Sequence, residues 1–498
     1  MPRQHTTVSG SRGNTMIVAN RYLALRLVTL SSAFAATAFA VAPADAAPGD
    51  PLGAAFQVAT FGTRQVVAAR SASGAFVVLY QTGTNFSPVV AQLYNANGSA
   101  HGSPVTVVPA SAAAVADYSV AMDGAGNFVV AWDEFGSSIS TVKARRFSAS
   151  GAAQGAAFLP DGQGTQAHGS FQPAVAMNAS GEFVVGWQRL NAGASYSAPL
   201  PIPGCINADS IVFSNPTIAY RRYQAGGTAV GSAASIAVAR PGVAINVVTC
   251  AIDATLTLSS QPVYGGDTLG APKVAIGAGG DFAITWPTSL SSGVMLDGLL
   301  VGLANSSITL QRYNANGVPA LQQKAQDLPS LTLVVGKQAE AAHIATGTAG
   351  TALVWDTVQF KQATGEDIFQ LLTRAYGPAG LAKTLAPVIQ SGGSQVVSYT
   401  AYNPDIAATP TGSVVAWNAT TGTGAGAPAR IQALRLDANG KALGAPIDVA
   451  DSSSGASLLF TGTPAVVSDA SGDFAVFWAT AVPPAGAQRI YGRLYSGR

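Results

Sequence analysis

One phrase returns along the whole chain and constrains the fold more than any other feature. It reads SVAMDGAGNFVVAW up to Trp132, PAVAMNASGEFVVGW up to Trp187 and PAVVSDASGDFAVFW up to Trp478. Each copy places a turn of Asp or Asn, Gly and other small residues between two short apolar runs, which is typical of a β-hairpin. Repetition at this scale indicates an array of similar structural units.

Looser copies bring the number of repeats to seven, and each copy ends in an aromatic residue. All six tryptophans of the chain are used at this position. The seven aromatic residues are Tyr80, Trp132, Trp187, Trp286, Trp355, Trp417 and Trp478. We expect them to pack between neighbouring units, because a large ring contributes most to stability where it is buried.

A second phrase follows the aromatic residue after a connection of variable length. VAQLYNANGSAHGSPVTV and IQALRLDANGKALGAPIDV again read as strand, turn and strand, with Asn-Gly type turns. Two hairpins make four strands, the content of one propeller blade. The sequence therefore predicts an all-β, seven-bladed β-propeller of four-stranded antiparallel blades, a single domain over residues 47–498.

The last repeat stops before its outer strand. The missing piece is present near the start of the chain, where GDPLGAAFQV from Gly49 to Val58 matches GKALGAPIDV from Gly440 to Val449. We expect this N-terminal strand to complete the last blade and close the ring, because an open sheet edge would otherwise remain.

The repeat resembles a broad group of bacterial secreted proteins with units of the form D-x-x-G-[DN]-F-V-V-x-W followed by a Y-[DN]-x-x-G hairpin. The resemblance covers nearly all of the chain from Gly49 to Arg498 and implies a propeller fold. It implies little about function, because propellers serve both as binding modules and as enzymes.

Residues 1–46 have the layout of a secretory signal peptide. Arg21 and Arg26 precede an uncharged run from Leu27 to Ala42, and Ala44-Asp45-Ala46 forms a small-x-small cleavage site. The alternative is an uncleaved anchor helix, but the run is shorter than the ~20 residues that a span needs. We expect a secreted or periplasmic protein with no membrane span after cleavage.

Charge and motifs exclude several classes of function. Without the leader the chain loses four of its 26 basic residues and one of its 24 acidic residues and is nearly neutral, so it offers no electrostatic footprint for nucleic acid. His101, His168 and His343 lie in different repeats, and no G-x-S-x-G or H-E-x-x-H motif occurs. We expect no metal site, no cofactor and a monomer.

The two cysteines, Cys205 and Cys250, lie in insertions of the third repeat at residues 188–216 and 240–271. An oxidising compartment favours a disulfide between them over two free thiols. Such a bond would brace two long loops on one face of the propeller.

Connections between the two hairpins of a repeat are long and irregular, whereas the turns within hairpins are short. We expect the face that carries the long connections to bind partners, because binding residues tend to lie on loops of a rigid scaffold. The residue after the aromatic is polar in five copies: Gln81, Asp133, Gln188, Asp356 and Asn418. These side chains either line a polar ligand pocket or satisfy backbone groups at strand ends.

Acidic residues on this face are the candidates for glycoside chemistry, which uses a pair of carboxylates. They are Asp133, Glu134, Asp209, Asp356, Glu366 and Asp367. Acidic or amide residues in the hairpin turns lack the spacing of a calcium loop and are interpreted as Asx turns; they are Asp123, Asn178, Asp281 and Asp469.

The leading hypothesis is an exported, non-enzymatic propeller that binds a protein, peptide or glycan partner through the face of long connections. The alternatives are a secreted carbohydrate-active enzyme, hydrolase or lyase, and a structural cell-surface protein. The sequence names no catalytic residue.

Overall fold

The computed structural model describes residues 46–498, with the exception of short internal segments. These segments are 61–64, 112, 136–139, 163–167, 192–194, 197–210, 237–241, 247–261, 266, 297–298, 321, 329–337, 362–365, 381, 384–385, 391–398, 422–428, 452–458 and 483–486. Cys205 and Cys250 lie outside the described residues, so their pairing stays a prediction.

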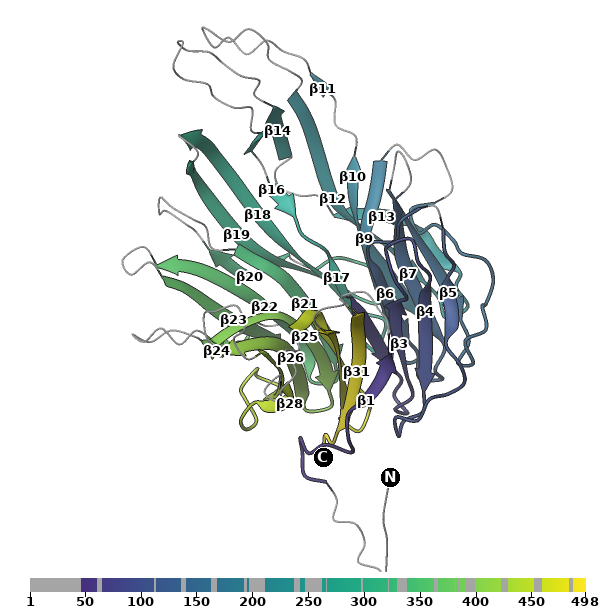
Figure 1. The fold of residues 1–498 in the computed structure, drawn as a ribbon. Coiled ribbons are helices and arrows are strands. Elements are labelled where there is room, and N and C mark those ends of the chain that lie inside the picture. Colours follow the sequence, from purple (N-terminus) through teal and green to yellow (C-terminus); the bar gives the residue numbers. More distant parts are fainter. Residues whose placement is uncertain are drawn as a thin grey trace, which may run out of the picture. The chain divides into compact units, whose positions relative to one another are not determined.

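Seven small antiparallel sheets, the blades, make up the described chain (Figure 1). This confirms the predicted all-β, seven-bladed β-propeller. Four blades follow the simple pattern of consecutive strands. Blade 1 contains β2 (Val66–Arg70), β3 (Phe76–Gln81), β4 (Val89–Tyr94) and β5 (Val105–Val108). Blade 2 contains β6 (Tyr118–Met122), β7 (Phe128–Phe135) and β8 (Ser140–Phe147). Blade 5 contains β21 (Gln338–Gly347), β22 (Gly350–Lys361), β23 (Glu366–Tyr376) and β24 (Ala386–Gln390). Blade 6 contains β25 (Tyr399–Thr409), β26 (Gly412–Thr421), β27 (Ala429–Asp437) and β28 (Ile447–Asp451).

Blades 3, 4 and 7 depart from that pattern. Blade 3 contains β9 (His168–Met177), β10 (Phe183–Asn191), β12 (Ile211–Tyr223) and β13 (Ala229–Ile236), and is extended by β11 (Ser195–Tyr196), β14 (Gly242–Asn246) and β15 (Pro262–Gly265). Blade 4 contains β16 (Asp267–Leu269), β17 (Lys273–Ile276), β18 (Phe282–Leu296), β19 (Leu299–Tyr313) and β20 (Gln323–Leu328). Blade 7 contains β29 (Leu459–Ser468), β30 (Phe474–Val482), β31 (Ala487–Tyr495) and the N-terminal strand β1 (Phe56–Ala59).

Strand β1 pairs antiparallel with β31, with Phe56 opposite Gly492, and the two strands lie side by side near the C-terminus in Figure 1. The register requires a glycine on β31. A Cβ atom at Gly492 would lie 2.6 Å from the Phe477 ring and 3.0 Å from the Phe56 ring. The aromatic side chain of Phe56 in β1 thus packs over Gly492, which has no side chain.

Two expectations about the blades need correction. Blade 2 has three named strands, and its outer position is held by isolated bridges of Phe158 with Ala144 and of Ala153 with Phe147. The long connections are also more regular than expected. In blade 4, β18 and β19 stay paired from Phe282 and Tyr313 to Leu296 and Leu299. The inner and outer hairpins are therefore joined by extensions of the sheet, because the strands continue to satisfy their backbone groups with each other.

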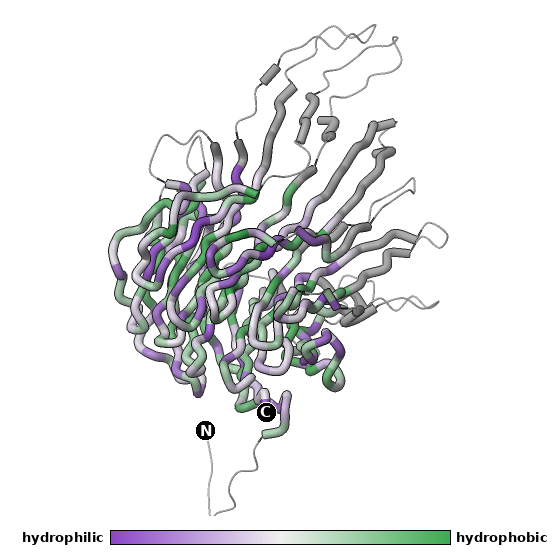
Figure 2. The backbone as a smooth tube through the Cα atoms, turned by 180° about the vertical axis from the view of Figure 1, so that it is seen from behind, coloured by the Kyte–Doolittle hydropathy of each residue, from purple (hydrophilic) through white to green (hydrophobic). Residues whose placement is uncertain are grey.

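The repeat aromatics pack across the junctions between blades, as predicted. Trp132 of β7 contacts a cluster with Val77 and Leu79 of blade 1, and Tyr80 of β3 lies in the cluster that contains Ala465 and Phe477 of blade 7. Three of the tryptophans, Trp187, Trp355 and Trp417, have no exposed surface. Figure 2 shows the backbone coloured by hydropathy, with hydrophobic stretches in green within the blades. Strands such as β3 and β4 are buried along their whole length, as expected for sheets that pack against a neighbouring blade on both faces.

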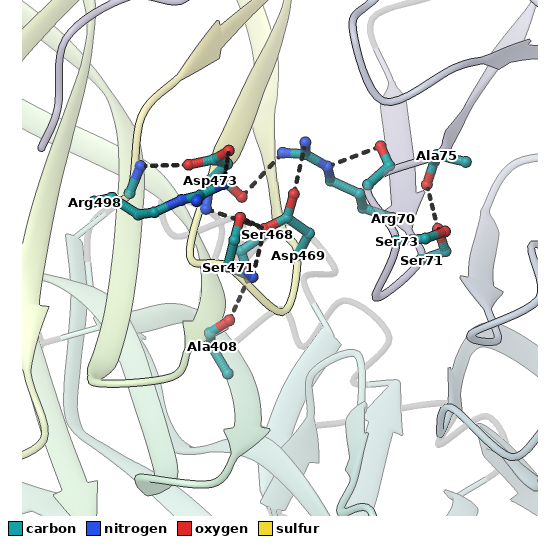
Figure 3. A network of polar contacts seen from close by, with 12 residues as sticks. Arg70, Ser71, Ser73, Ala75, Ala408, Ser468, Asp469, Ser471, Asp473 and Arg498 are labelled. Atoms are coloured by element: carbon teal, nitrogen blue, oxygen red, sulfur yellow. Dashed lines mark hydrogen bonds and ion pairs between the residues drawn. The ribbon is translucent and has the colours of Figure 1, made fainter. Parts of the chain in front are cut away.

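A buried arginine joins blade 1 to blade 7 (Figure 3). Arg70, at the end of β2, has a side chain that is only 2% exposed and lies 2.9 Å from the carboxylate of Asp469. It also donates to the carbonyl oxygens of Asp473 at 2.9 Å and Gly74 at 3.1 Å. The carboxylate and carbonyl partners compensate the desolvation of the guanidinium group.

Replacement of Arg70 by Leu should lower the free energy of unfolding by about 3–5 kcal/mol, because it leaves the Asp469 carboxylate buried without its cation. Chemical denaturation measures this value. The matched control, Arg489→Leu, alters an exposed arginine of β31 and should change stability little. Adding Asp469→Asn to the Arg70 variant should restore part of the loss, and no restoration would argue against the ion pair as the cause.

Candidate functional site

A central cavity of about 550 Å³ is lined by the innermost strands of all seven blades. The lining residues lie at or near the starts of several of these strands, including Val66–Ala68 of β2 and Lys273–Val274 of β17. Each innermost strand starts where the chain enters from the preceding blade. In a propeller this entry point lies on the same face as the connections between the two hairpins of a blade. The cavity therefore opens toward the face of long connections, and its volume falls within the range of small-molecule pockets.

Strand register identifies one level of this cavity where the repeats differ. In every blade, one residue of the innermost strand lies opposite the residue that directly precedes the repeat aromatic. This residue is Val67 in blade 1, Ser119 in blade 2, Ala174 in blade 3, Lys273 in blade 4, His343 in blade 5, Asp405 in blade 6 and Ala465 in blade 7. Three consecutive blades thus place a titratable side chain where other copies have a small or apolar one.

His343 and Asp405 form a pair across the junction of blades 5 and 6. The Nδ1 atom of His343 lies 2.7 Å from Oδ1 of Asp405, and both side chains are partly exposed. The second carboxylate oxygen accepts the backbone N–H of Val466 at 2.8 Å. The Val466 N–H fixes the Asp405 carboxylate, which in turn orients the imidazole of His343. When Nδ1 of His343 carries the proton, Nε2 can accept a hydrogen bond.

Asp117 and Lys273 lie on the other side of the same cavity. Burial raises the pKa of Asp117, and the positive charge of Lys273 opposes this rise. Both side chains line the cavity, so they interact across it although blade 3 lies between their blades. Blade 3 contributes only the small residue Ala174 at this level. The cavity therefore offers two polar pairs, the Asp117 carboxyl with the Lys273 ammonium group and the Asp405 carboxylate with the His343 imidazole.

Asp133 lies directly behind Asp117. It has no exposed surface, and its Oδ1 accepts the backbone N–H groups of Ala116 at 3.2 Å and Asp117 at 2.9 Å. Its Oδ2 accepts the N–H of Gln172 in blade 3 at 3.1 Å. Burial raises the pKa of Asp133 to about 6, against the effect of these backbone donors, and the charge of Asp117 adds to the rise.

The other polar residues after the repeat aromatics also bond to backbone groups. Asp356 accepts the N–H of Asn403 at 3.0 Å. The amides donate to carbonyl oxygens, Gln81 to Ser87, Gln188 to Leu269 and Asn418 to Gly462. All five predicted ligand-binding residues, Gln81, Asp133, Gln188, Asp356 and Asn418, are buried, and none lines the central cavity. Their assignment to ligand binding stays a prediction.

Two of these carboxylates stabilise an unusual backbone position. Gln172 and Asn403 have φ angles of 53° and 52°, in the left-handed region that non-glycine residues rarely adopt. Each precedes a proline and interrupts the pairing of the innermost strand. The carboxylates of Asp133 and Asp356 accept the N–H groups of these residues. Asp133 thus joins blade 2 to a β-bulge in blade 3, and Asp356 joins blade 5 to a β-bulge in blade 6.

The candidate carboxylates for glycoside chemistry are partly committed to such contacts. Glu134 accepts from Trp132 Nε1 at 2.8 Å and from Lys143 Nζ at 2.6 Å. Asp209 and the side chains of Glu366 and Asp367 lie outside the described part of the structure.

In the hairpin turns, Asp123 Oδ1 accepts the N–H groups of Ala125 and Asn127, which is an Asx turn.

The charged residues of the cavity were missed in the sequence, although a signal was present. Lys273 lies thirteen residues before Trp286, whereas His343 and Asp405 lie twelve residues before Trp355 and Trp417. The shorter hairpins of blades 5 and 6 hide their equivalence. Alignment of the repeats on the start of the innermost strand, with one gap in the turn, brings all three into one column.

No protein-family model and no characterised relative matches the sequence. Solved structures with a related architecture include several carbohydrate-active enzymes. A PL25 ulvan lyase is 8% identical over 91% of this chain and 96% of its own, with a TM-score of 0.45. An α-L-arabinanase of Penicillium chrysogenum is 12% identical over 77% of this chain and 93% of its own, with a TM-score of 0.36. A GH93 α-L-arabinofuranosidase of Fusarium graminearum is 8% identical, covers 90% and 97%, and has a TM-score of 0.36. Likenesses at this level carry no information on the ligand of this chain.

Asp133 should make the stability of the protein depend on pH. Its pKa is about 6 in the folded chain and about 3.9 when unfolded, so the folded state binds the proton more tightly. The free energy of unfolding should therefore decrease as the pH rises from about 4 to 6, by on the order of 3 kcal/mol from this group. The variant Asp133→Asn should lose this component, as measured by urea denaturation across that range.

Asp437 provides the contrasting control. Backbone N–H groups of Lys441 and Asn439 lower the pKa of this exposed carboxyl, so its contribution is present at neutral pH and is lost as the pH falls. Asp437→Asn should change the pH dependence in the opposite sense. Equal pH profiles for Asp133→Asn and the parent protein would contradict the raised pKa of the buried Asp133 carboxyl.

Proposed function

We propose that the chain is an exported propeller that binds a small polar ligand, or the polar end of a larger partner, in the central cavity. The observation that supports this most directly is the position of Lys273, His343 and Asp405 at one level of three consecutive blades. Ionisable groups near the axis lose part of their hydration and add little to packing. Their presence, where other repeats have Val, Ser or Ala, is better explained by ligand binding than by stability.

Export is supported by the start of the compact part of the chain. The compact unit begins at Ala46, which is the residue before the predicted cleavage point. The N–H of Ala47 donates to Oδ2 of Asp50 at 3.0 Å. Cleavage there would create an α-amino group with a carboxylate partner already in place. None of the described residues belongs to a helix that is long and apolar enough to cross a membrane.

Replacement of Lys273 by Met should weaken ligand binding by about tenfold or more, because a hydrogen bond to a charged group contributes about 1.5–3 kcal/mol. Arrays of neutral oligosaccharides and of uncharged peptides first identify a bound probe, and titration calorimetry then measures its affinity. Lys441→Met, on an exposed hairpin turn of blade 6, is the matched control. Equal affinities of the two variants would remove the cavity from consideration.

A second candidate function, a carbohydrate-active enzyme, is favoured by the His343–Asp405 pair. A histidine oriented by a carboxylate is the usual arrangement of a general base. In an enzyme, His343→Gln and Asp405→Asn should abolish product formation from a bound oligosaccharide while its dissociation constant changes much less. A binding protein should release no product with the parent chain, as measured by chromatography of the incubated oligosaccharide.

A further inference from the structure

Two exposed phenylalanines lie on the same face as the central cavity. Phe86 is 54% exposed and follows β3 in blade 1, and Phe135 is 44% exposed and ends β7 in blade 2. Both belong to the connections between the inner and outer hairpins of their blades. Exposed large apolar side chains indicate a binding surface where they lie together beside a pocket.

Backbone hydrogen bonds place the two residues close to each other and to the cavity. The N–H of Val115 donates to the carbonyl of Asn85 at 2.7 Å, and the N–H of Phe135 donates to the carbonyl of Ala114 at 2.8 Å. The segment Ala114–Val115 thus lies between the two connections, which puts their backbones about 10 Å apart because paired strands are spaced by about 4.8 Å. Asp117, two residues further, lines the cavity.

The connection that carries Phe86 is uncharged and rich in hydroxyl and amide groups. Its sequence from residue 81 to 88 is QTGTNFSP, and Thr82, Thr84 and Asn85 are exposed. Internal bonds fix its shape, since the N–H of Ser87 donates to Thr84 at 2.8 Å and Gln81 Nε2 donates to Ser87 at 3.0 Å. A rigid loop binds at a lower entropic cost than a mobile one.

Charges near Phe135 are already paired. Glu134 accepts from Trp132 and lies 2.6 Å from Lys143 Nζ. Within the cavity, Asp117 is coupled to Lys273 and Asp405 is bonded to His343. The surface from the cavity to the two rings therefore offers donors, acceptors and apolar rings without a strong excess of either charge.

We propose that Phe86 and Phe135 form an aromatic platform for an uncharged oligosaccharide that extends outward from the central cavity. This inference rests on the proposed function and names its ligand class. Sugar rings present apolar C–H faces to aromatic side chains, and their hydroxyl groups pair with the exposed hydroxyls and amides of the loop. A charged peptide, an anionic lipid or a nucleic acid would instead require an unpaired charge along this path.

The test uses the mature chain, residues 47–498, and neutral oligosaccharides from disaccharides to hexasaccharides on an array, beside an array of peptides. The parent chain should bind longer oligosaccharides more tightly than the disaccharide of the same series. Phe86→Ala and Phe135→Ala should each reduce hexasaccharide affinity by about tenfold, because each ring buries apolar surface against a sugar. Both variants should leave disaccharide affinity unchanged, since the disaccharide occupies the cavity.

Controls separate this inference from the proposed function. Val318→Ala removes an equally exposed side chain, 58% accessible, from a hairpin turn of blade 4 and should change no affinity, while Phe86→Tyr should retain most of the hexasaccharide binding. If Lys273→Met abolishes all binding but the phenylalanine variants bind normally, the aromatic platform is refuted, whereas ligand binding in the central cavity is supported. If the phenylalanine variants lose binding but Lys273→Met does not, the proposal that the ligand binds in the central cavity is refuted. Binding of peptides alone, or of neither probe, overturns the platform.

Discussion

The packing of one aromatic side chain per repeat against the preceding blade is the interaction on which the rest of the structure depends. Each blade is a small twisted sheet with two apolar faces, which it cannot bury by itself. The aromatic residue of strands such as β7 and β10 fills the space between two sheets, so that each blade completes the core of its neighbour. Every junction is built in this way, including the one between blades 7 and 1.

Polar atoms inside the propeller mostly serve the same junctions. The residue after the aromatic enters the interior, where an unpaired polar group would be costly. In four blades it finds its partner in the backbone of the next blade, as in Asp356 with Asn403 and Asn418 with Gly462. The left-handed residues Gln172 and Asn403 are tolerated because a carboxylate accepts their N–H groups. Lys273, His343 and Asp405 have a different character, since they depart from the repeat and line the central cavity.

Much of the fold could be predicted from the sequence because the repeat states it seven times. The positions of the tryptophans, the hairpin turns and the match between the start of the chain and the outer strand of blade 6 all follow from local patterns, and β1 pairs with β31. Predictions about the connections were less accurate. The connections were expected to be irregular, yet residues such as Leu290 and Asn305 continue a paired ladder, because a segment interrupted by Ser and Gly, without regular alternation of apolar and polar residues, gives no strong signal for a strand.

What the sequence determined by itself is the unit and its number, since apolar alternation, turn residues and one aromatic per copy suffice to specify a blade and its packing. Only the tertiary structure decided which side chains meet at the axis. Lys273, His343 and Asp405 follow one another along the chain at spacings of 70 and 62 residues and lie in hairpins of unequal length, so no local pattern relates them. The arrangement of the blades around one axis brings them to a common level, because every innermost strand pairs with the second strand of its blade in the same register.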